Sequence, residues 1–166
     1  LVIEELARVD ASLAVTVAVH NSVGAYPIVR WGTDEQKRRY LPPMATGEAL
    51  GAFALTEPQA GSDAANLKCR AVRDGDRYIV NGVKAWCTNG PVAHTIVLMA
   101  VTDPGLGSKG ISAFILEAGT PGFQSGTVED KMGLRSSKTS ELVLDNCAIP
   151  AANRLGNEGD GLKVAL

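Results

Sequence analysis

The first part of the chain has apolar side chains at the spacing of a helix. Over residues 1–23 the apolar positions recur every three or four residues and form one broad face. Gly24 is a suitable residue to end this helix, and Asp10 is a potential break or new cap within it. A short helical turn is predicted over 27–31, closed by Gly32.

A capping box predicts where the next helix begins. Thr33 can accept a hydrogen bond from the backbone of Gln36, whose side chain can reach back to the backbone of Thr33. We expect this helix to end before Pro42-Pro43, because a residue that precedes proline avoids the helical conformation. Residues 44–47 are then a linker.

From Leu50 onward the hydrophobic period changes to that of a strand. Asp74-Gly75-Asp76 and Asn81-Gly82 are predicted hairpin turns, because both supply positions that tolerate a positive φ. We expect an α+β fold, in which a helical segment precedes an antiparallel β-sandwich or barrel-like sheet and a C-terminal helix begins at the end. The predicted strands are 51–56, 67–73, 77–81, 83–88, 95–102, 111–116, 122–128 and 139–146.

Composition narrows the class of protein. Of the 166 residues, 45% are hydrophobic and 20% are charged, which is typical of a globular domain. The net charge of −2 gives no basic surface for nucleic acid. No apolar run approaches the roughly 20 residues of a membrane span. The three cysteines are widely spaced and neither histidine has partners at metal spacing, so we expect reduced buried thiols and no metal site.

Two segments carry the candidate chemistry. Residues 53–62 run from a strand into a turn that contains proline, glycine and hydroxyl groups. On a later strand, Trp86 and Thr88 point to the same side because they are two positions apart, while Cys87 points into the core. An aromatic wall, hydroxyl donors and a closely approaching backbone are what a planar cofactor with polar edges, such as a flavin, requires.

These segments closely resemble the acyl-CoA dehydrogenase family. The stretch Phe53-Ala54-Leu55-Thr56-Glu57-Pro58, followed by Ala60-Gly61-Ser62-Asp63, is similar to the first signature of the family. The stretch from Asn81 to Gly90 is similar to the strand that lies along the flavin. Residues 132–137 and 155–161 resemble two further landmarks, so that the resemblance covers essentially the whole chain.

The resemblance implies FAD as the cofactor and gives roles to individual residues. The Thr56 hydroxyl and the backbone of Leu55 and Thr56 would bind the pyrimidine edge of the flavin, while Trp86 would flank the ring and Thr88 would bond its N5 edge. Gly61 and Ser62 would contact the pyrophosphate, and Ser62 would also bind the substrate beside the thioester arm. The complete implied cofactor-binding set is Phe53, Leu55, Thr56, Gly61, Ser62, Trp86, Cys87 and Thr88.

Glu57 is a tempting catalytic base, but the resemblance implies a structural role for it. The resemblance places the catalytic base, a glutamate, in a C-terminal domain beyond Leu166. Because the chain begins and ends within helical segments, we expect it to be a fragment. Within that fragment, 1–46 would end an N-terminal helical domain, 47–155 would form the middle β-domain and 156–166 would begin a C-terminal helical domain. The fragment itself would be inactive.

By resemblance, the parent protein would oxidise acyl-CoA thioesters to 2-enoyl-CoA and pass electrons to an electron-transfer flavoprotein. It would be a homotetramer in the bacterial cytoplasm or the mitochondrial matrix, nearest to the short-chain, butyryl-type members. Three alternatives remain open at this point: an acyl-CoA oxidase of the same fold, a nitroalkane oxidase-like flavoenzyme, and a β-sandwich binding module without flavin.

Overall fold

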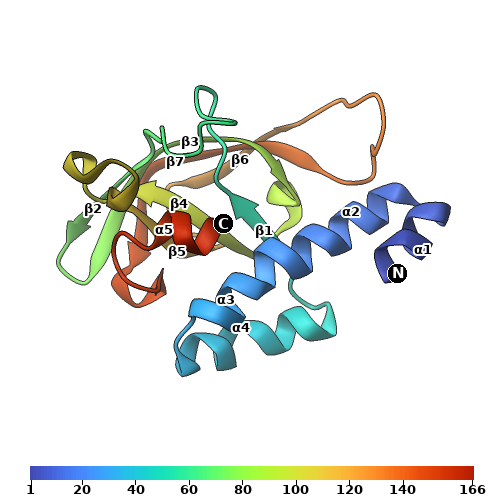
Figure 1. Cartoon of the computed structure of the whole chain (residues 1–166), viewed down its shortest axis with the longest axis horizontal. Coiled ribbons are helices and arrows are strands. Elements are labelled where there is room, and N and C mark those ends of the chain that lie inside the picture. Colours follow the sequence, from blue (N-terminus) through green and yellow to red (C-terminus); the bar gives the residue numbers. More distant parts are fainter.

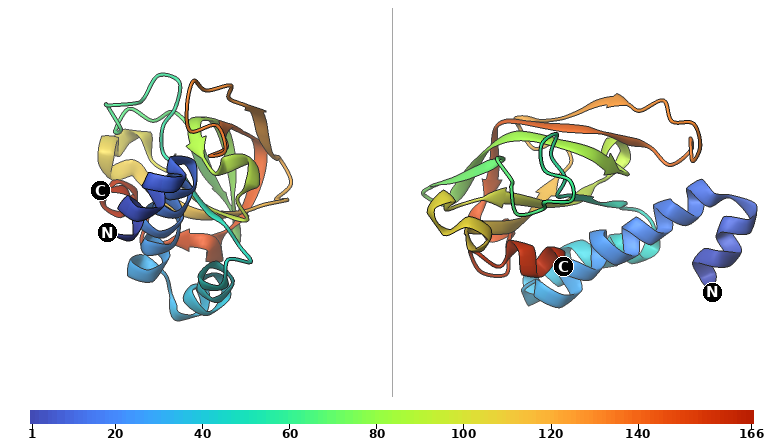
Figure 2. Two further views of the ribbon diagram at one scale, coloured as in Figure 1. Left: turned by 90° about the vertical axis from the view of Figure 1, so that its right-hand side faces the viewer. Right: turned by 45° about the horizontal axis from the view of Figure 1, so that its top comes forward.

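A helical arm lies along one side of a strongly curved sheet in the computed structural model, which describes residues 1–166 (Figures 1 and 2). The helices are α1 (Val2–Val9), α2 (Ala11–Val19), the π-helical η1 (His20–Ala25), α3 (Tyr26–Trp31), α4 (Asp34–Thr46) and α5 (Gly161–Ala165). The strands are β1 (Gly51–Ala54), β2 (Arg70–Asp74), β3 (Arg77–Thr88), β4 (Thr95–Val101), β5 (Ile111–Glu117), β6 (Phe123–Val128), β7 (Thr139–Pro150) and β8 (Arg154–Leu155). The short 3-10 turns are η2 (Gly90–Val92), η3 (Pro104–Gly110) and η4 (Ala151–Asn153).

The first predicted helix breaks where its sequence suggested. Asp10 is extended, and its carboxylate accepts hydrogen bonds from the backbone of Ser12 and Leu13, so it caps α2. The predicted stop at Gly24 was wrong, because the chain passes through η1 into α3 without leaving the helical region. A β-carbon on Gly24 would lie 3.0 Å from the backbone of Gly51, so the glycine serves a close approach to β1.

The helical rod from Ala11 to Trp31 has 21 residues and is apolar enough to cross a membrane by length and composition alone. The apolar runs within it are short, because polar residues such as Ser12, Thr16 and His20 interrupt them. Core helices of globular proteins meet the same criteria, so the observation is weak evidence for a span.

The capping box that opens α4 is confirmed, with both of its hydrogen bonds between Thr33 and Gln36 present. The predicted end before Pro42-Pro43 was wrong, because α4 includes both prolines and ends at Thr46, followed by left-handed Gly47. Tertiary contacts hold the helix in place. The Gln36 amide donates to the carbonyls of Ala152 and Arg154, at 2.8 and 2.9 Å.

The strands form one mostly antiparallel sheet in the order β6-β7-β3-β2-β4-β5-β8, with β1 added beside β4 in parallel. The sheet does not close into a barrel, since β6 and β8 remain at its two ends. The hairpin at Asp74-Gly75-Asp76 is confirmed. The one predicted at Asn81-Gly82 was wrong: β3 continues through it, and Gly82 has a φ of 151° where a β-carbon would lie 2.7 Å from the Cα atom of Cys69.

The central strands β4 and β5 are buried on both faces. Alternate residues of β4 belong to two hydrophobic clusters: Ile96, Leu98 and Ala100 to one, and Val97, Met99 and Val101 to the other. The first cluster lies inside the curved sheet, and the second lies between the sheet and the helices. The sheet is therefore a fixed support, and the candidate site lies where β1 and β3 end on it.

Candidate functional site

The structure brings the two candidate segments side by side, although about thirty residues separate them in sequence. The backbone N–H of Ala85 donates to the carbonyl of Thr56 at 2.8 Å. The ammonium of Lys84 donates to the carbonyl of Leu55 at 3.1 Å. The thiol of Cys87 donates to the carbonyl of Phe53 at 3.1 Å. The end of β1 and the end of β3 thus form one continuous surface.

Several polar groups on this surface have no partner within the chain. The backbone N–H groups of Leu55 and Thr56 and the hydroxyl of Thr56 donate no hydrogen bond, and all lie in half-buried residues. Backbone donors are normally paired when they are shielded from water. A ligand edge with acceptor atoms would satisfy all three donors at once.

Trp86 stands outward beside these donors. Its side chain is 63% exposed, and its φ of 57° is unusual for a bulky residue. The cause is an irregularity in the pairing of β3 with β7 between Lys84 and Cys87, where β3 contains one extra residue. Such bulges re-aim side chains beside functional sites. The sequence did not reveal this bulge.

Exposure alternates after the bulge in the manner expected of a strand. Trp86 is exposed, Cys87 is buried and Thr88 is half-buried, so Trp86 and Thr88 share a side. Burial raises the pKa of the Cys87 thiol to about 12. With that side chain in the core, only the backbone of Cys87 remains to contact a ligand.

The turn that follows Thr56 is closed by two backbone hydrogen bonds of 3.0 Å between Glu57 and Ala60. Gly61 and Ser62 come directly after it and are exposed. No helix begins at this point, so the backbone groups of these two residues are free without the support of a helix dipole. Their assigned contacts with a pyrophosphate and a thioester arm stay predictions.

Beneath the turn, the Glu57 carboxylate is fully engaged. It accepts hydrogen bonds from the Lys84 ammonium at 2.7 Å, from the backbone of Lys68 and Cys69, and from the Gln59 amide. Burial alone would raise the pKa of Glu57, but the hydrogen bond and charge of Lys84 outweigh it and hold this pKa below its ordinary value. Glu57 thus has no free oxygen directed at the exposed surface.

Two residues that matter here carried no assigned role in the sequence. Lys84 is fully buried. Strict alternation counted back from the buried Cys87 would place Lys84 on the outward side of the strand, but the extra residue between them turns its side chain inward. Asn89 is left-handed and buried, and its amide donates to the carbonyls of Thr16 and Gly51, which joins α2 to β1. Its position before Gly90 was the only sequence signal, since asparagine tolerates this conformation.

His20 strengthens the same junction. Its Nδ1 accepts from the backbone of Gly51 at 2.9 Å and its Nε2 lies 3.1 Å from the carbonyl of Met44, so the ring links η1 to β1 and α4. No group of three histidine, cysteine, aspartate or glutamate residues lies close enough together to hold a metal ion.

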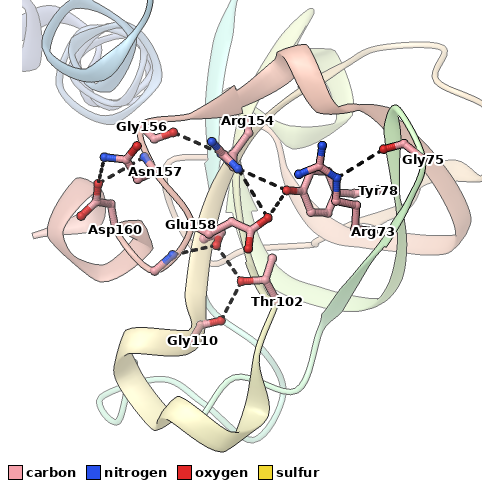
Figure 3. A network of polar contacts seen from close by, with 12 residues as sticks. Arg73, Gly75, Tyr78, Thr102, Gly110, Arg154, Gly156, Asn157, Glu158 and Asp160 are labelled. Carbon is pink, nitrogen blue, oxygen red and sulfur yellow. Dashed lines mark hydrogen bonds and ion pairs between the residues drawn. The ribbon is translucent and has the colours of Figure 1, made fainter.

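A second polar network lies at another part of the sheet, where the loop 155–160 meets β3 (Figure 3). Arg154 donates to the Tyr78 hydroxyl at 3.3 Å and to the Glu158 carboxylate at 3.4 Å, and Tyr78 itself donates to Glu158. Arg154 also donates to the carbonyl of Gly156 at 3.2 Å. These contacts fix the segment that leads into α5.

Comparison with known proteins decides the family. Residues 1–48 match the model of the acyl-CoA dehydrogenase N-terminal domain, and residues 52–147 match the model of the acyl-CoA dehydrogenase middle domain. The chain belongs to the acyl-CoA dehydrogenase family. It is 48% identical to an acyl-CoA dehydrogenase of Bacillus subtilis and 46% identical to a short-chain-specific acyl-CoA dehydrogenase of Clostridium acetobutylicum. Each match covers 100% of this chain and 44% of the relative, so the chain spans less than half the length of these two proteins.

Solved structures give the same result. The fold is similar to that of butyryl-CoA dehydrogenase from Megasphaera elsdenii, with a TM-score of 0.96 and 48% identity over 98% of this chain and 43% of that one. A chain in a structure described as the electron transferring flavoprotein of Acidaminococcus fermentans has a TM-score of 0.97 and 50% identity, over 98% of this chain and 43% of that one. An acyl-CoA dehydrogenase complexed with FAD from Bacillus anthracis has a TM-score of 0.92 and 39% identity, over 99% and 28%.

Proposed function

We propose that this chain forms the flavin-binding part of an enzyme that oxidises short acyl-CoA thioesters to 2-enoyl-CoA with FAD. The observation that carries the proposal is the contact between the ends of β1 and β3. Free N–H groups at Leu55 and Thr56 lie there beside the exposed indole of Trp86. Membership of the acyl-CoA dehydrogenase family supports the same conclusion.

The residues present fit a flavin. The unpartnered donors of Leu55 and Thr56 suit the acceptor atoms at the pyrimidine edge of the ring. The Trp86 indole offers a flat apolar face, and the Thr88 hydroxyl lies on the same side of the strand. The FAD complex of the B. anthracis relative is consistent with this choice of cofactor. When bound, FAD supplies the acceptor for a hydride.

The chain's own residues would then orient the flavin and the substrate and polarise the flavin ring. Donors at Leu55 and Thr56 stabilise negative charge at the ring edge, which favours the reduced form. Trp86 excludes water from one side of the site, and the Thr88 hydroxyl donates near the reacting edge. Ser62 would hold the thioester arm of the substrate. The turn that carries Ser62 is exposed, so the substrate can approach it closely.

Removal of the α proton needs a base, and Glu57 is unsuited to that role. Its carboxylate is buried, already accepts four hydrogen bonds and has a lowered pKa, so it is a poor proton acceptor at neutral pH. We therefore assign the base to a glutamate outside residues 1–166. It follows that these residues alone should not turn over substrate.

The remaining assignments rest on relatives. The short-chain relatives support a short acyl chain, and the similarity to a chain of the A. fermentans flavoprotein structure supports an electron-transfer flavoprotein as the acceptor. We place the protein in the bacterial cytoplasm or the mitochondrial matrix, and we expect a homotetramer.

The proposal is tested by measuring FAD content and acyl-CoA oxidation in the protein expressed from its complete gene. The purified protein should carry one FAD per subunit, and butyryl-CoA should reduce an artificial acceptor dye or an electron-transfer flavoprotein faster than octanoyl-CoA does. The reduced flavin should reoxidise slowly in air. Fast reoxidation by oxygen would assign the protein to the oxidases instead, and a preparation without flavin would refute the proposal.

A further inference from the structure

A buried cation lies directly beneath the surface where β1 meets β3. The Lys84 ammonium donates to the Glu57 carboxylate at 2.7 Å and to the backbone carbonyl of Leu55 at 3.1 Å. The bulge in β3 turns this side chain inward and Trp86 outward. Charged side chains are seldom fully buried, because removing a charge from water is costly. Lys84 therefore combines a high cost of burial with a contact at the edge of the candidate site.

The carbonyl that Lys84 binds belongs to the same peptide group as one of the unpartnered donors. The peptide bond between Leu55 and Thr56 carries the Leu55 carbonyl on one side and the Thr56 N–H on the other. In a planar trans peptide these two groups point in opposite directions. The Thr56 N–H is therefore directed away from the buried ammonium, and it has no hydrogen-bond partner within the chain.

The next peptide group along the chain is fixed at both of its ends. The Thr56 carbonyl accepts the backbone N–H of Ala85 at 2.8 Å. The N–H of the same peptide, that of Glu57, donates to the carbonyl of Ala60 at 3.0 Å. Residues of β3 thus hold two successive carbonyls, those of Leu55 and Thr56. A ligand that binds the Thr56 N–H meets a donor whose direction is set before the ligand arrives.

A cation on the carbonyl also strengthens the N–H of the same peptide as a donor. Hydrogen bonds in a chain polarise one another, and they are stronger where the surroundings exclude water. A hydrogen bond from an ammonium is roughly twice as strong as one between neutral groups. The Lys84 ammonium withdraws electron density from the Leu55 carbonyl, so the Thr56 N–H becomes more positive. Such a donor favours an acceptor atom that carries negative charge.

We propose that Lys84 is a positioning residue for the flavin: it orients and polarises the peptide between Leu55 and Thr56, so that the N–H binds the reduced ring more tightly than the oxidised ring. The inference rests on the proposed function for the identity of the ligand as FAD. Donors at the pyrimidine edge favour the reduced ring, because negative charge lies there. Lys84 acts through the peptide and is assigned no contact with the ring itself.

The double variant Glu57→Gln/Lys84→Met tests this in the protein expressed from its complete gene. It removes both charges together, so that no unpaired charge remains buried. We expect the affinity for reduced FAD, relative to that for oxidised FAD, to fall about tenfold, which lowers the reduction potential of the bound flavin by about 30 mV. An anaerobic titration with reference dyes measures this potential. Lys84→Gln, which replaces the charge by a neutral amide donor, should shift the potential in the same direction.

Gln59→Met is the matched control. It removes another donor to the same Glu57 carboxylate, one at 2.6 Å, and leaves both contacts of Lys84 in place. The control should lose some stability, but the potential of its bound flavin should equal that of the wild type. An equal fall of the potential in the control would overturn the inference.

The outcomes separate this inference from the proposed function. A lowered potential in the double variant would support the role of Lys84 even in a protein that does not oxidise butyryl-CoA. An unchanged potential would overturn that role, whether or not oxidised FAD binds less tightly, because a purely structural pair would alter affinity without altering the potential. The wild type would still hold FAD in that case, so the proposed function would stand. A wild type without flavin would refute both.

Discussion

Breaking the buried ion pair between Glu57 and Lys84 should destabilise the fold more than any surface change. The side chain of Lys84 is completely buried and that of Glu57 nearly so, and their charged atoms lie 2.7 Å apart. Replacing Lys84 by methionine keeps the length of the side chain but removes the ammonium. The Glu57 carboxylate then remains in the interior with its three other donors and no cation.

The expected loss is about 3–5 kcal/mol in the free energy of unfolding, because one partner of a buried pair is left uncompensated. Arg77→Met is the matched control, since Arg77 pairs with Asp74 at 2.9 Å but both side chains are more than half exposed. That change should cost less than about 1 kcal/mol. The double variant Glu57→Gln/Lys84→Met should lose less than the sum of the two single changes.

Urea denaturation at two pH values measures the loss of unfolding free energy in Lys84→Met and shows whether this loss grows or shrinks on acidification. In the wild type the lowered pKa of Glu57 contributes stability above the pKa of the unfolded chain, and this contribution is lost as the pH falls. Without Lys84, burial raises that pKa, so the carboxyl can accept a proton and the penalty should shrink near pH 5. A penalty below about 1 kcal/mol at pH 7, or one that grows on acidification, would refute this reasoning.

The remaining predictions concern the candidate site and the thiols. Trp86→Ala should weaken FAD binding by about 1–3 kcal/mol, the usual cost of removing an aromatic contact, and an unchanged affinity in a titration would contradict the role of Trp86. Thr88→Val should slow flavin reduction in stopped-flow experiments more than it weakens FAD binding, because the lost hydroxyl matters most as the hydride arrives; reduction at the wild-type rate would refute this. The thiols of Cys69, Cys87 and Cys147 should resist alkylation at pH 8 until the protein unfolds, because burial raises their pKa values to about 11, 12 and 11. Rapid labelling of the folded protein would show that they are accessible.

Local signals predicted those parts of the fold that local contacts determine. The capping box at Thr33 and the hairpin at Asp74-Gly75-Asp76 depend on neighbouring residues alone, and both are present. The predicted end of the first helix at Gly24 was wrong, because that glycine allows a close contact with Gly51 on β1, which lies far along the chain. The hairpin turn predicted at Asn81-Gly82 was wrong for the same reason, since Gly82 packs against Cys69 within the sheet.

The candidate site shows the same division. Its motifs were visible in the sequence, but their contact depends on the parallel pairing of β1 with β4 and on the hydrogen bond from Ala85 to Thr56. The burial of Lys84 could not be predicted, because the bulge before Cys87 reverses the expected side of the strand. The continuation of α4 through Pro42-Pro43 was likewise not predicted, because the local preference before proline gives no information on contacts such as those of Gln36 with Ala152 and Arg154, which anchor this helix.

Tryptophan fluorescence tests most directly whether flavin binds where β1 meets β3. The chain has two tryptophans, and only Trp86 belongs to this surface, whereas Trp31 lies at the end of α3. When FAD is added to the apoprotein, the account predicts that quenching persists in a Trp31→Phe variant and is largely lost in a Trp86→Phe variant. Quenching that persists without Trp86 and disappears without Trp31 would contradict the account.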